Sequence, residues 1–191
     1  MYPSQLSTSC ADFYSLSRTS YIIIYLKDFF PRAGLAQDGW STKEEATATC
    51  YCGAVQLVLP ITKPGFVFSF VCHCSDCRKI TASMFTTGIV VLDTHLKHIR
   101  GEENLKQFSQ SDTIERDGSA MTNFFCSTCG SLMYRRSSAY AGVSVLRGGT
   151  VDDFRLVETV LKPDVEQFCR HRVGWLQGIK GLRQSLGQAK I

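Results

Sequence analysis

Apolar and polar residues alternate in several stretches after residue 47, and this pattern predicts β-strands. The clearest cases are "AVQLVLP" (54–60) and "GFVFSFVCHC" (65–74). In each predicted strand, alternate apolar residues would share one face. They are Val55, Leu57 and Leu59 in the first strand, and Phe66, Phe68 and Phe70 in the second. Side chains point to opposite faces at successive strand positions, so a period of two is typical of half-buried strands.

The rest of this region is also predicted to be sheet. The predicted elements are a short buried strand at 86–93, a strand-turn-strand at 95–112, a strand-knuckle-strand at 122–136, a strand with a Gly-Gly turn at 139–153, and a late strand at 164–176. The only helix that we expect is a short turn at 78–83. The fold class is therefore a mostly antiparallel β domain, with knuckle turns at strand ends.

The first part of the chain differs from the rest. We interpret residues 1–46 as an N-terminal extension, with one short apolar element at 21–30, and residues 47–191 as the functional domain, which contains seven cysteines in three clusters. The apolar run "YIIIYL" (21–26) is much shorter than the about 20 residues that cross a bilayer. No secretory signal pattern precedes it. We therefore expect a soluble, cytoplasmic protein without a membrane partner.

Charge is distributed unevenly. Residues 1–49 carry four Lys/Arg and five Asp/Glu, and residues 50–191 carry seventeen and twelve. This modest excess of positive charge in the domain favours anionic ligands, including a thiol that bears carboxylates, but it is too small for a nucleic-acid partner. We expect Arg135 and Arg136 to form a solvated strand end.

Seven of the nine cysteines lie in three tight clusters. These are "CYCG" (50–53), "CHCSDC" (72–77) and "CSTCG" (126–130). Disulfide frameworks usually space cysteines along the chain, so this pattern favours metal-bound thiolates in a reducing compartment. Cys10 and Cys169 each stand alone in the sequence. A lone cysteine is usually a small, buried apolar residue.

Seven cysteines divide into a set of four and a set of three. Structural zinc sites use four protein ligands, while catalytic sites use three and keep one position open. The two pairs followed by glycine, Cys50 with Cys52 and Cys126 with Cys129, would close a structural site. Cys72, Cys74 and Cys77 would then hold a catalytic zinc from a single loop, with a free position for water or a thiol. Alternatively, the second site is also structural, with His73, His95, His98 or His171 as its fourth ligand.

The same residues resemble a known family. C-x-C-G, then C-H-C-x-x-C-R, then F-C-x-x-C-G are similar to the motifs of the glutathione-dependent formaldehyde-activating enzymes, a family that includes the centromere protein V-like proteins. "GGTVDD" (148–153) and "KPDVEQFCRHRVGWL" (162–176) add weaker support, and the resemblance runs from about Thr47 to the C-terminus.

The resemblance implies a β-tent of antiparallel sheets and the same division of the cysteines between two zinc ions per chain. It also implies a carbon–sulfur lyase that joins glutathione to formaldehyde as S-(hydroxymethyl)glutathione. A thiol bound at the free position would lose its proton and add to the carbonyl carbon. Arg78 and Lys79 follow Cys77, and they would moderate the negative charge there or contact a glutathione carboxylate, unless they form a solvated basic pair.

Two other functions stay open at this point. One is a non-enzymatic, zinc-stabilised binding module, but the chain has no basic, low-complexity tail of the kind expected in a chromatin or cytoskeleton binder. The other is a redox or metal-buffering protein, for which more exposed cysteines in a smaller chain would be expected. No sequence feature indicates the oligomeric state.

Overall fold

The computed structural model describes residues 33–115 and 118–189. The apolar element predicted at 21–30, and Cys10, lie outside the described residues. A compact unit runs from Gly34 to the C-terminus, and the fold described below is that of this unit. The boundary that we expect at residue 47 between an extension and the zinc-binding domain stays a prediction.

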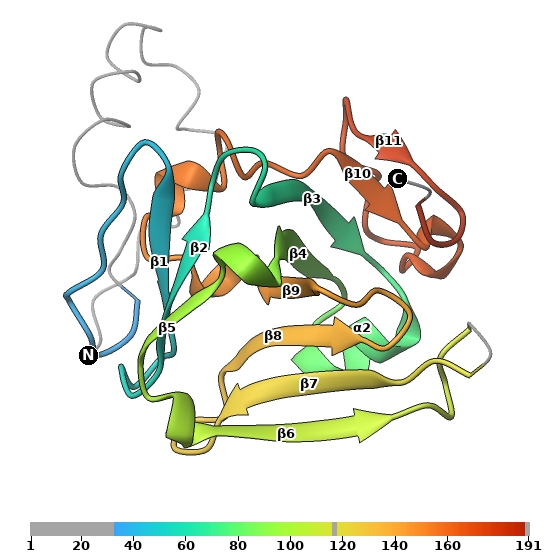
Figure 1. The fold of residues 1–191 in the computed structure, drawn as a ribbon. Helices are drawn as coiled ribbons and strands as arrows, with labels where there is room; N and C mark the ends of the chain where they lie inside the picture. The colour runs from blue at the N-terminus through green and yellow to red at the C-terminus, as the bar shows by residue number, and fades with distance from the viewer. Residues whose placement is uncertain (1–32, 116–117, 190–191) are drawn as a thin grey trace, which may run out of the picture. The chain divides into compact units, whose positions relative to one another are not determined.

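Strands make up most of the regular structure (Figure 1). They are β1 (Glu45–Thr49), β2 (Gln56–Pro60), β3 (Phe66–Cys72), β4 (Thr86–Leu92), β5 (Lys97–Arg100), β6 (Leu105–Gln110), β7 (Met121–Cys126), β8 (Leu132–Ser137), β9 (Val143–Arg147), β10 (Val165–Gln167) and β11 (Arg183–Gln184). The α-helix of the unit is α2 (Ser75–Thr81), and the 3₁₀ turns are Asp93–His95, Glu102–Asn104, Gly148–Thr150, Phe154–Leu156 and Cys169–His171.

The strands form two sheets. One has the order β1-β2-β5, and the other has the order β11-β10-β3-β4-β9-β8-β7-β6. All pairings are antiparallel except those of β10, which lies parallel to both β3 and β11. The predicted fold class, mostly β with antiparallel sheets, is confirmed.

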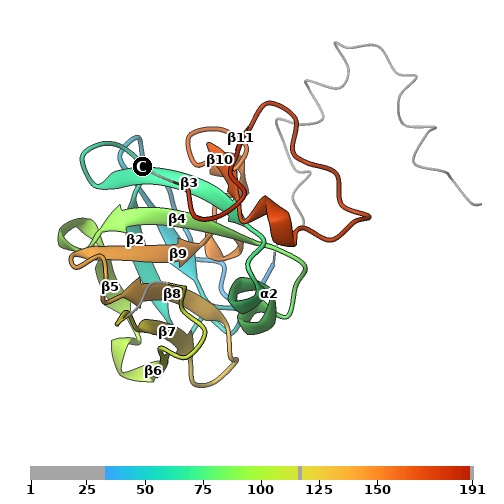
Figure 2. The same cartoon turned by 90° about the vertical axis from the view of Figure 1, so that its right-hand side faces the viewer.

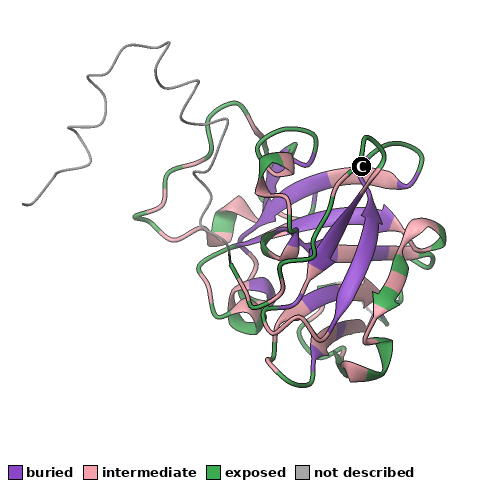
Figure 3. Ribbon diagram, turned by 90° about the vertical axis from the view of Figure 1, so that its left-hand side faces the viewer, coloured by how far each residue is buried: buried purple, intermediate pink, exposed green. Residues whose placement is uncertain are grey.

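The main core lies between the two sheets. Both faces of β2 are buried, and Val55, Leu57 and Leu59 belong to one apolar cluster, as the alternation predicts. Opposite them stand buried residues of the large sheet: Ile89, Val91, Met133 and Leu146. Buried residues are concentrated on the strands (Figure 3). This core fixes the strand ends from which the cysteine loops project.

The other face of the large sheet carries a second apolar cluster. Phe68 and Phe70 belong to it, whereas Phe66 packs against the core between the sheets. The prediction that all three phenylalanines share one face is therefore wrong for Phe66. The cause is a shift in the β3–β4 register between Phe66 and Phe68, since such a bulge interrupts the alternation of side chains.

The helix begins earlier than the sequence suggests. It starts at Ser75 instead of Arg78 because the Cys74 sulfur caps it, accepting a hydrogen bond from the Cys77 backbone N–H at 3.3 Å. The helix lies beside the ends of β3 and β4 (Figure 2). In the described part of the chain, no helix has the length and apolar character needed to cross a membrane.

Candidate metal centres

The first group of cysteines brings together two turns that are distant in the sequence. Cys50 and Cys52 follow β1, while Cys126 ends β7 and Cys129 lies in the turn after it. Gly53 and Gly130 have positive φ angles of 82° and 73°, which glycine adopts without strain, and each donates its N–H to the carbonyl oxygen of the first cysteine of its turn. The four sulfurs lie within 4.8 Å of one another.

These sulfurs have the spacing of a tetrahedral metal site. The Cys50 and Cys52 sulfurs are 3.6 Å apart, and those of Cys52 and Cys126 are 3.8 Å apart. Zinc–sulfur bonds of about 2.3 Å place the sulfurs of a tetrahedron about 3.8 Å apart. A disulfide would require about 2.05 Å. The donor set and its spacing therefore fit zinc.

The surroundings of the four sulfurs do not favour the thiolate form equally. Burial raises the pKa of the Cys50 thiol to about 12, although the Val55 N–H donates to its sulfur at 3.2 Å. Burial would also raise the pKa of Cys129, but hydrogen bonding with Ser131 outweighs it and lowers the pKa to about 6. A positive ion is needed to stabilise the buried Cys50 as a thiolate.

The second group comes from a single loop. Cys72 ends β3, Cys74 caps α2, and Cys77 lies in the first turn of that helix. Their sulfurs again lie within 4.8 Å of one another, and no fourth Cys, His, Asp or Glu among the described residues joins them. Cys72 and Cys77 are fully buried, whereas Cys74 is half-buried. Three thiol ligands converging in this way also fit zinc.

His73 lies between two of these cysteines but points away from them. Its Nε2 is 2.7 Å from Oε1 of Glu166, and both side chains are buried. The same oxygen accepts a hydrogen bond from Arg172 at 2.9 Å, and Oε2 accepts one from the Ile179 N–H at 3.1 Å. The network ties the cysteine loop to β10. None of the four histidines that might complete the site belongs to the group.

Two arginines of the large sheet, Arg135 and Arg147, lie beside this loop, and sequence reasoning assigned neither of them to the site. Nη1 of Arg135 is 3.2 Å from the Cys77 sulfur. Arg147 is buried, and none of its three side-chain nitrogens has a hydrogen-bond partner among the described residues. Hydrogen bonds from the Cys72 and Cys74 thiols, and then the charges of both arginines, lower the pKa of Cys77. Burial, and then the charge of Arg135, lowers the pKa of Arg147 to about 10.

The expectation of a solvated Arg135–Arg136 pair is wrong for Arg135. Adjacent strand residues face opposite ways, so Arg135 turns toward Cys77 while Arg136 stacks over Phe124 and Tyr134 on the other face.

Lys79 is exposed and lines the cavity described next, and Arg78 is half-buried. Their contact with glutathione stays a prediction.

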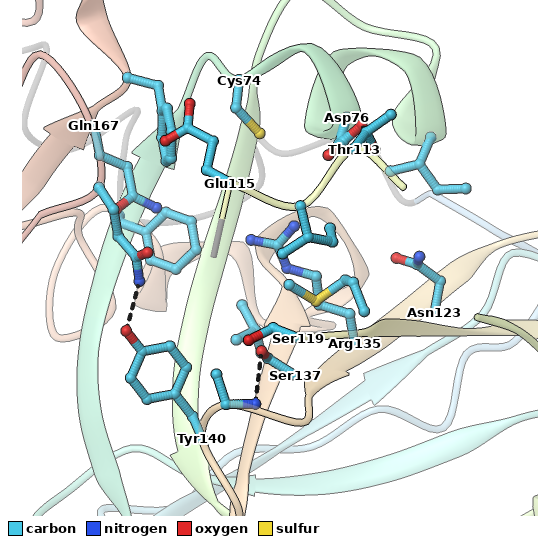
Figure 4. A pocket seen from close by; sticks show the side chains of 18 of the residues that line it. Cys74, Asp76, Thr113, Glu115, Ser119, Asn123, Arg135, Ser137, Tyr140 and Gln167 are labelled. Carbon is cyan, nitrogen blue, oxygen red and sulfur yellow. Dashed lines mark hydrogen bonds between the residues drawn. The ribbon is translucent and has the colours of Figure 1, made fainter. Parts of the chain in front are cut away.

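A cavity of about 680 Å³ adjoins the three-cysteine loop (Figure 4). The Cys74 sulfur and the Arg135 guanidinium both point into it. Its volume is in the range of small-molecule sites, about 300–1,000 Å³. The group of four cysteines contributes no residue to its lining. The two groups therefore differ: one joins two turns of the fold, and the other faces a space that a ligand can fill.

The fold and the site define a two-sheet β protein with two groups of cysteines whose geometry fits metal ions. Residues 45–171 match the family model described as "Glutathione-dependent formaldehyde-activating enzyme". The chain belongs to this family, as the motif resemblance implied.

Other comparisons were more distant. A solved structure of a Rhodobacter sphaeroides protein is similar over 56% of this chain and 88% of its own, with 22% identity and a TM-score of 0.45. A search of curated proteins found no match.

Proposed function

We propose that the protein is a zinc-dependent carbon–sulfur lyase, which adds glutathione or a similar thiol to formaldehyde or a related aldehyde and catalyses the reverse reaction. Family membership supports a reaction between glutathione and formaldehyde. The observation that carries the proposal is the second cysteine group, whose Cys74 sulfur faces a ligand-sized cavity while no fourth protein ligand is present among the described residues.

The two cysteine groups would hold one zinc ion each. Cys50, Cys52, Cys126 and Cys129 would hold a structural ion, and Cys72, Cys74 and Cys77 a catalytic one. When bound, the catalytic ion would favour the deprotonated form of a coordinated thiol at neutral pH. The cluster spacing suits metal-bound thiolates, which supports a reducing, cytoplasmic location for the protein.

The chain's own residues would hold the reactants and balance their charge. Three cysteine thiolates and one Zn²⁺ carry a net charge of −1, and a substrate thiolate makes it −2. The guanidinium groups of Arg135 and Arg147 beside Cys77 would offset this charge. Lys79 lines the cavity, and in this proposal it would contact a glutathione carboxylate.

The reaction itself is an addition with no change in oxidation state. The thiol loses its proton, a C–S bond forms between the sulfur and the carbonyl carbon, and the carbonyl oxygen takes up a proton to become a hydroxyl. In the reverse direction the C–S bond breaks and releases thiol and aldehyde. Walls that exclude bulk water from Cys74 would strengthen the attraction of the arginines for the reacting sulfur.

Exchange NMR with ¹³C-formaldehyde tests this function, because it measures how fast glutathione and its hydroxymethyl adduct interconvert at equilibrium. The zinc-loaded protein should accelerate the exchange, and Cys74→Ser should return it to the background rate. Cys169→Ser is the matched control, since Cys169 belongs to neither group. Background exchange with a folded wild-type protein that holds both zinc ions would rule the function out and favour a non-enzymatic binding module.

A further inference from the structure

The cavity beside the three-cysteine loop has a floor made by one face of the large sheet. Strand pairing places six lining residues in one continuous row across five neighbouring pairs of strands. In order from β3 to β6, they are Phe68, Val90, Val145, Arg135, Asn123 and Phe108. The row is therefore apolar from Phe68 to Val145, becomes polar at Arg135, the residue that contacts Cys77, and ends on the exposed Phe108.

Half of this floor is entirely apolar. Every lining residue that β3, β4 and β9 supply is a valine or a phenylalanine: Val67, Phe68, Phe70, Val90, Val143 and Val145. Phe68, Val143 and Val145 remain half-buried, so part of this surface is open to the cavity. Apolar surface that faces a space of this size is stabilised when an apolar group covers it.

The other half supplies charged as well as polar groups, beside the apolar Phe108 and Met121. Arg135, Asn123, Ser137 and Gln110 line it from β6 to β8, and Asp76 and Lys79 line it from α2. Further polar residues, Gln167, His171 and Gln188, line the cavity at or near β10, beyond β3. Glutathione carries two carboxylates and one ammonium group, which need charged or hydrogen-bonding partners. Arg135, Lys79 and Asp76 offer both signs of charge on this half, so a glutathione that pairs with them leaves the apolar half to whatever else is attached to its sulfur.

Formaldehyde is too small to use that space. It is little larger than a water molecule, whose share of liquid volume is about 30 Å³. The cavity is about 680 Å³. A single hydroxymethyl group on the sulfur would leave the valines and phenylalanines of β3, β4 and β9 uncovered.

We propose that the preferred carbonyl substrate is an aldehyde with an apolar chain or ring, whose substituent covers the apolar half of the floor. This rests on the proposed function and specifies its substrate class. The chemistry is unchanged: the thiol proton is lost, sulfur bonds to the carbonyl carbon, the oxygen gains a proton, and the product is a hemithioacetal with a bulky apolar substituent.

Binding of unreactive S-alkyl glutathiones tests the substrate class separately from catalysis, because their alkyl group stands in for the substituent of the adduct. Calorimetry on the zinc-loaded protein should show S-hexylglutathione binding at least tenfold tighter than S-methylglutathione. The physical reason is that five further methylene groups leave water.

Two valine-to-tryptophan variants locate the effect. Val145→Trp fills the apolar half and should reduce the hexyl preference to less than threefold. Val160→Trp makes the same change at a residue that is 50% exposed and does not line the cavity, and it should keep the full preference. If Val145→Trp does not fold, Val143→Trp takes its place. If neither variant folds, the affinities of the wild type for S-hexylglutathione and S-methylglutathione decide whether the substrate class is correct.

The outcomes separate the two proposals. Equal binding of the two compounds to the wild type, or a hexyl preference that survives in folded Val145→Trp, overturns the substrate class and leaves the proposed function standing. No binding of glutathione or of either derivative overturns both. Tighter hexyl binding that Val145→Trp abolishes and Val160→Trp retains supports the proposal.

Discussion

Nη1 of Arg135 lies 3.2 Å from the sulfur of Cys77, although 58 residues separate them in the sequence. The contact links the helical end of the cysteine loop to β8, an interior strand of the large sheet. It places a fixed positive charge beside the group of three thiols. The chain thereby offsets the charge of these ligands with a residue of its rigid sheet.

Replacing Arg135 should therefore weaken the second metal site. Arg135→Met keeps much of the side-chain volume but removes the charge and the hydrogen bond to Cys77, and we expect zinc affinity at this site to fall about 10–100-fold. Competition with a chromophoric chelator measures the affinity. Arg136→Met is the matched control, since Arg136 faces away from the cysteines. Equal losses in the two variants would contradict the role of the Arg135–Cys77 contact.

The two cysteine groups should respond differently to loss of a ligand. The wild type should contain two zinc ions per chain by elemental analysis. Cys126→Ser should unfold the domain, because structural zinc contributes on the order of 10 kcal/mol to folding in small zinc domains. Cys74→Ser should leave a folded protein with one ion, since its group belongs to one loop. Circular dichroism and zinc content of both variants provide the check, and equal unfolding would make the second site structural too.

Glu166 should contribute to stability through its buried contacts. Glu166→Gln removes the charge that faces His73 and Arg172, and we expect the free energy of unfolding to fall by about 1–3 kcal/mol in denaturant titrations. Glu45→Gln, which breaks a solvent-exposed pair with Lys97, should cost less than about 1 kcal/mol. A Glu166→Gln variant as stable as Glu45→Gln would show that the network does not hold the loop.

The same carboxylate gives this contribution a pH dependence. Burial would raise the pKa of Glu166, but the Ile179 N–H, Arg172 and His73 outweigh it and lower the pKa. A lowered folded-state pKa means that the stabilisation is complete above the ordinary value of about 4.3 and is lost as the pH falls below it. The stability difference between wild type and Glu166→Gln should accordingly stay constant from pH 8 to pH 6.

Local patterns in the sequence predicted the strands and the grouping of cysteines, because alternation and C-x-x-C spacing act over a few residues. Of the late strand predicted at 164–176, only Val165–Gln167 is a strand, which lies parallel to β3, and Cys169–His171 forms a 3₁₀ turn. The bulge that turns Phe66 away from Phe68 depends on the partner strand β4. Likewise, the inward turn of Arg135 and Arg147 depends on which sheet face meets the cysteine loop, and a single sequence does not encode that contact locally.

Proton release on glutathione binding tests the central claim, that the three-cysteine loop presents a position where an external thiol becomes a ligand. A thiol of pKa about 8.5 must lose its proton to bind, so binding at pH 7 should release about one proton. Below that pKa, the apparent affinity for glutathione should rise about tenfold for each unit by which the pH is increased. Calorimetry in two buffers of different ionisation enthalpy counts the proton, with Cys74→Ser as the control. Release of one proton by the wild type and none by the variant is the predicted result; binding without proton release, or unchanged in Cys74→Ser, would contradict the account.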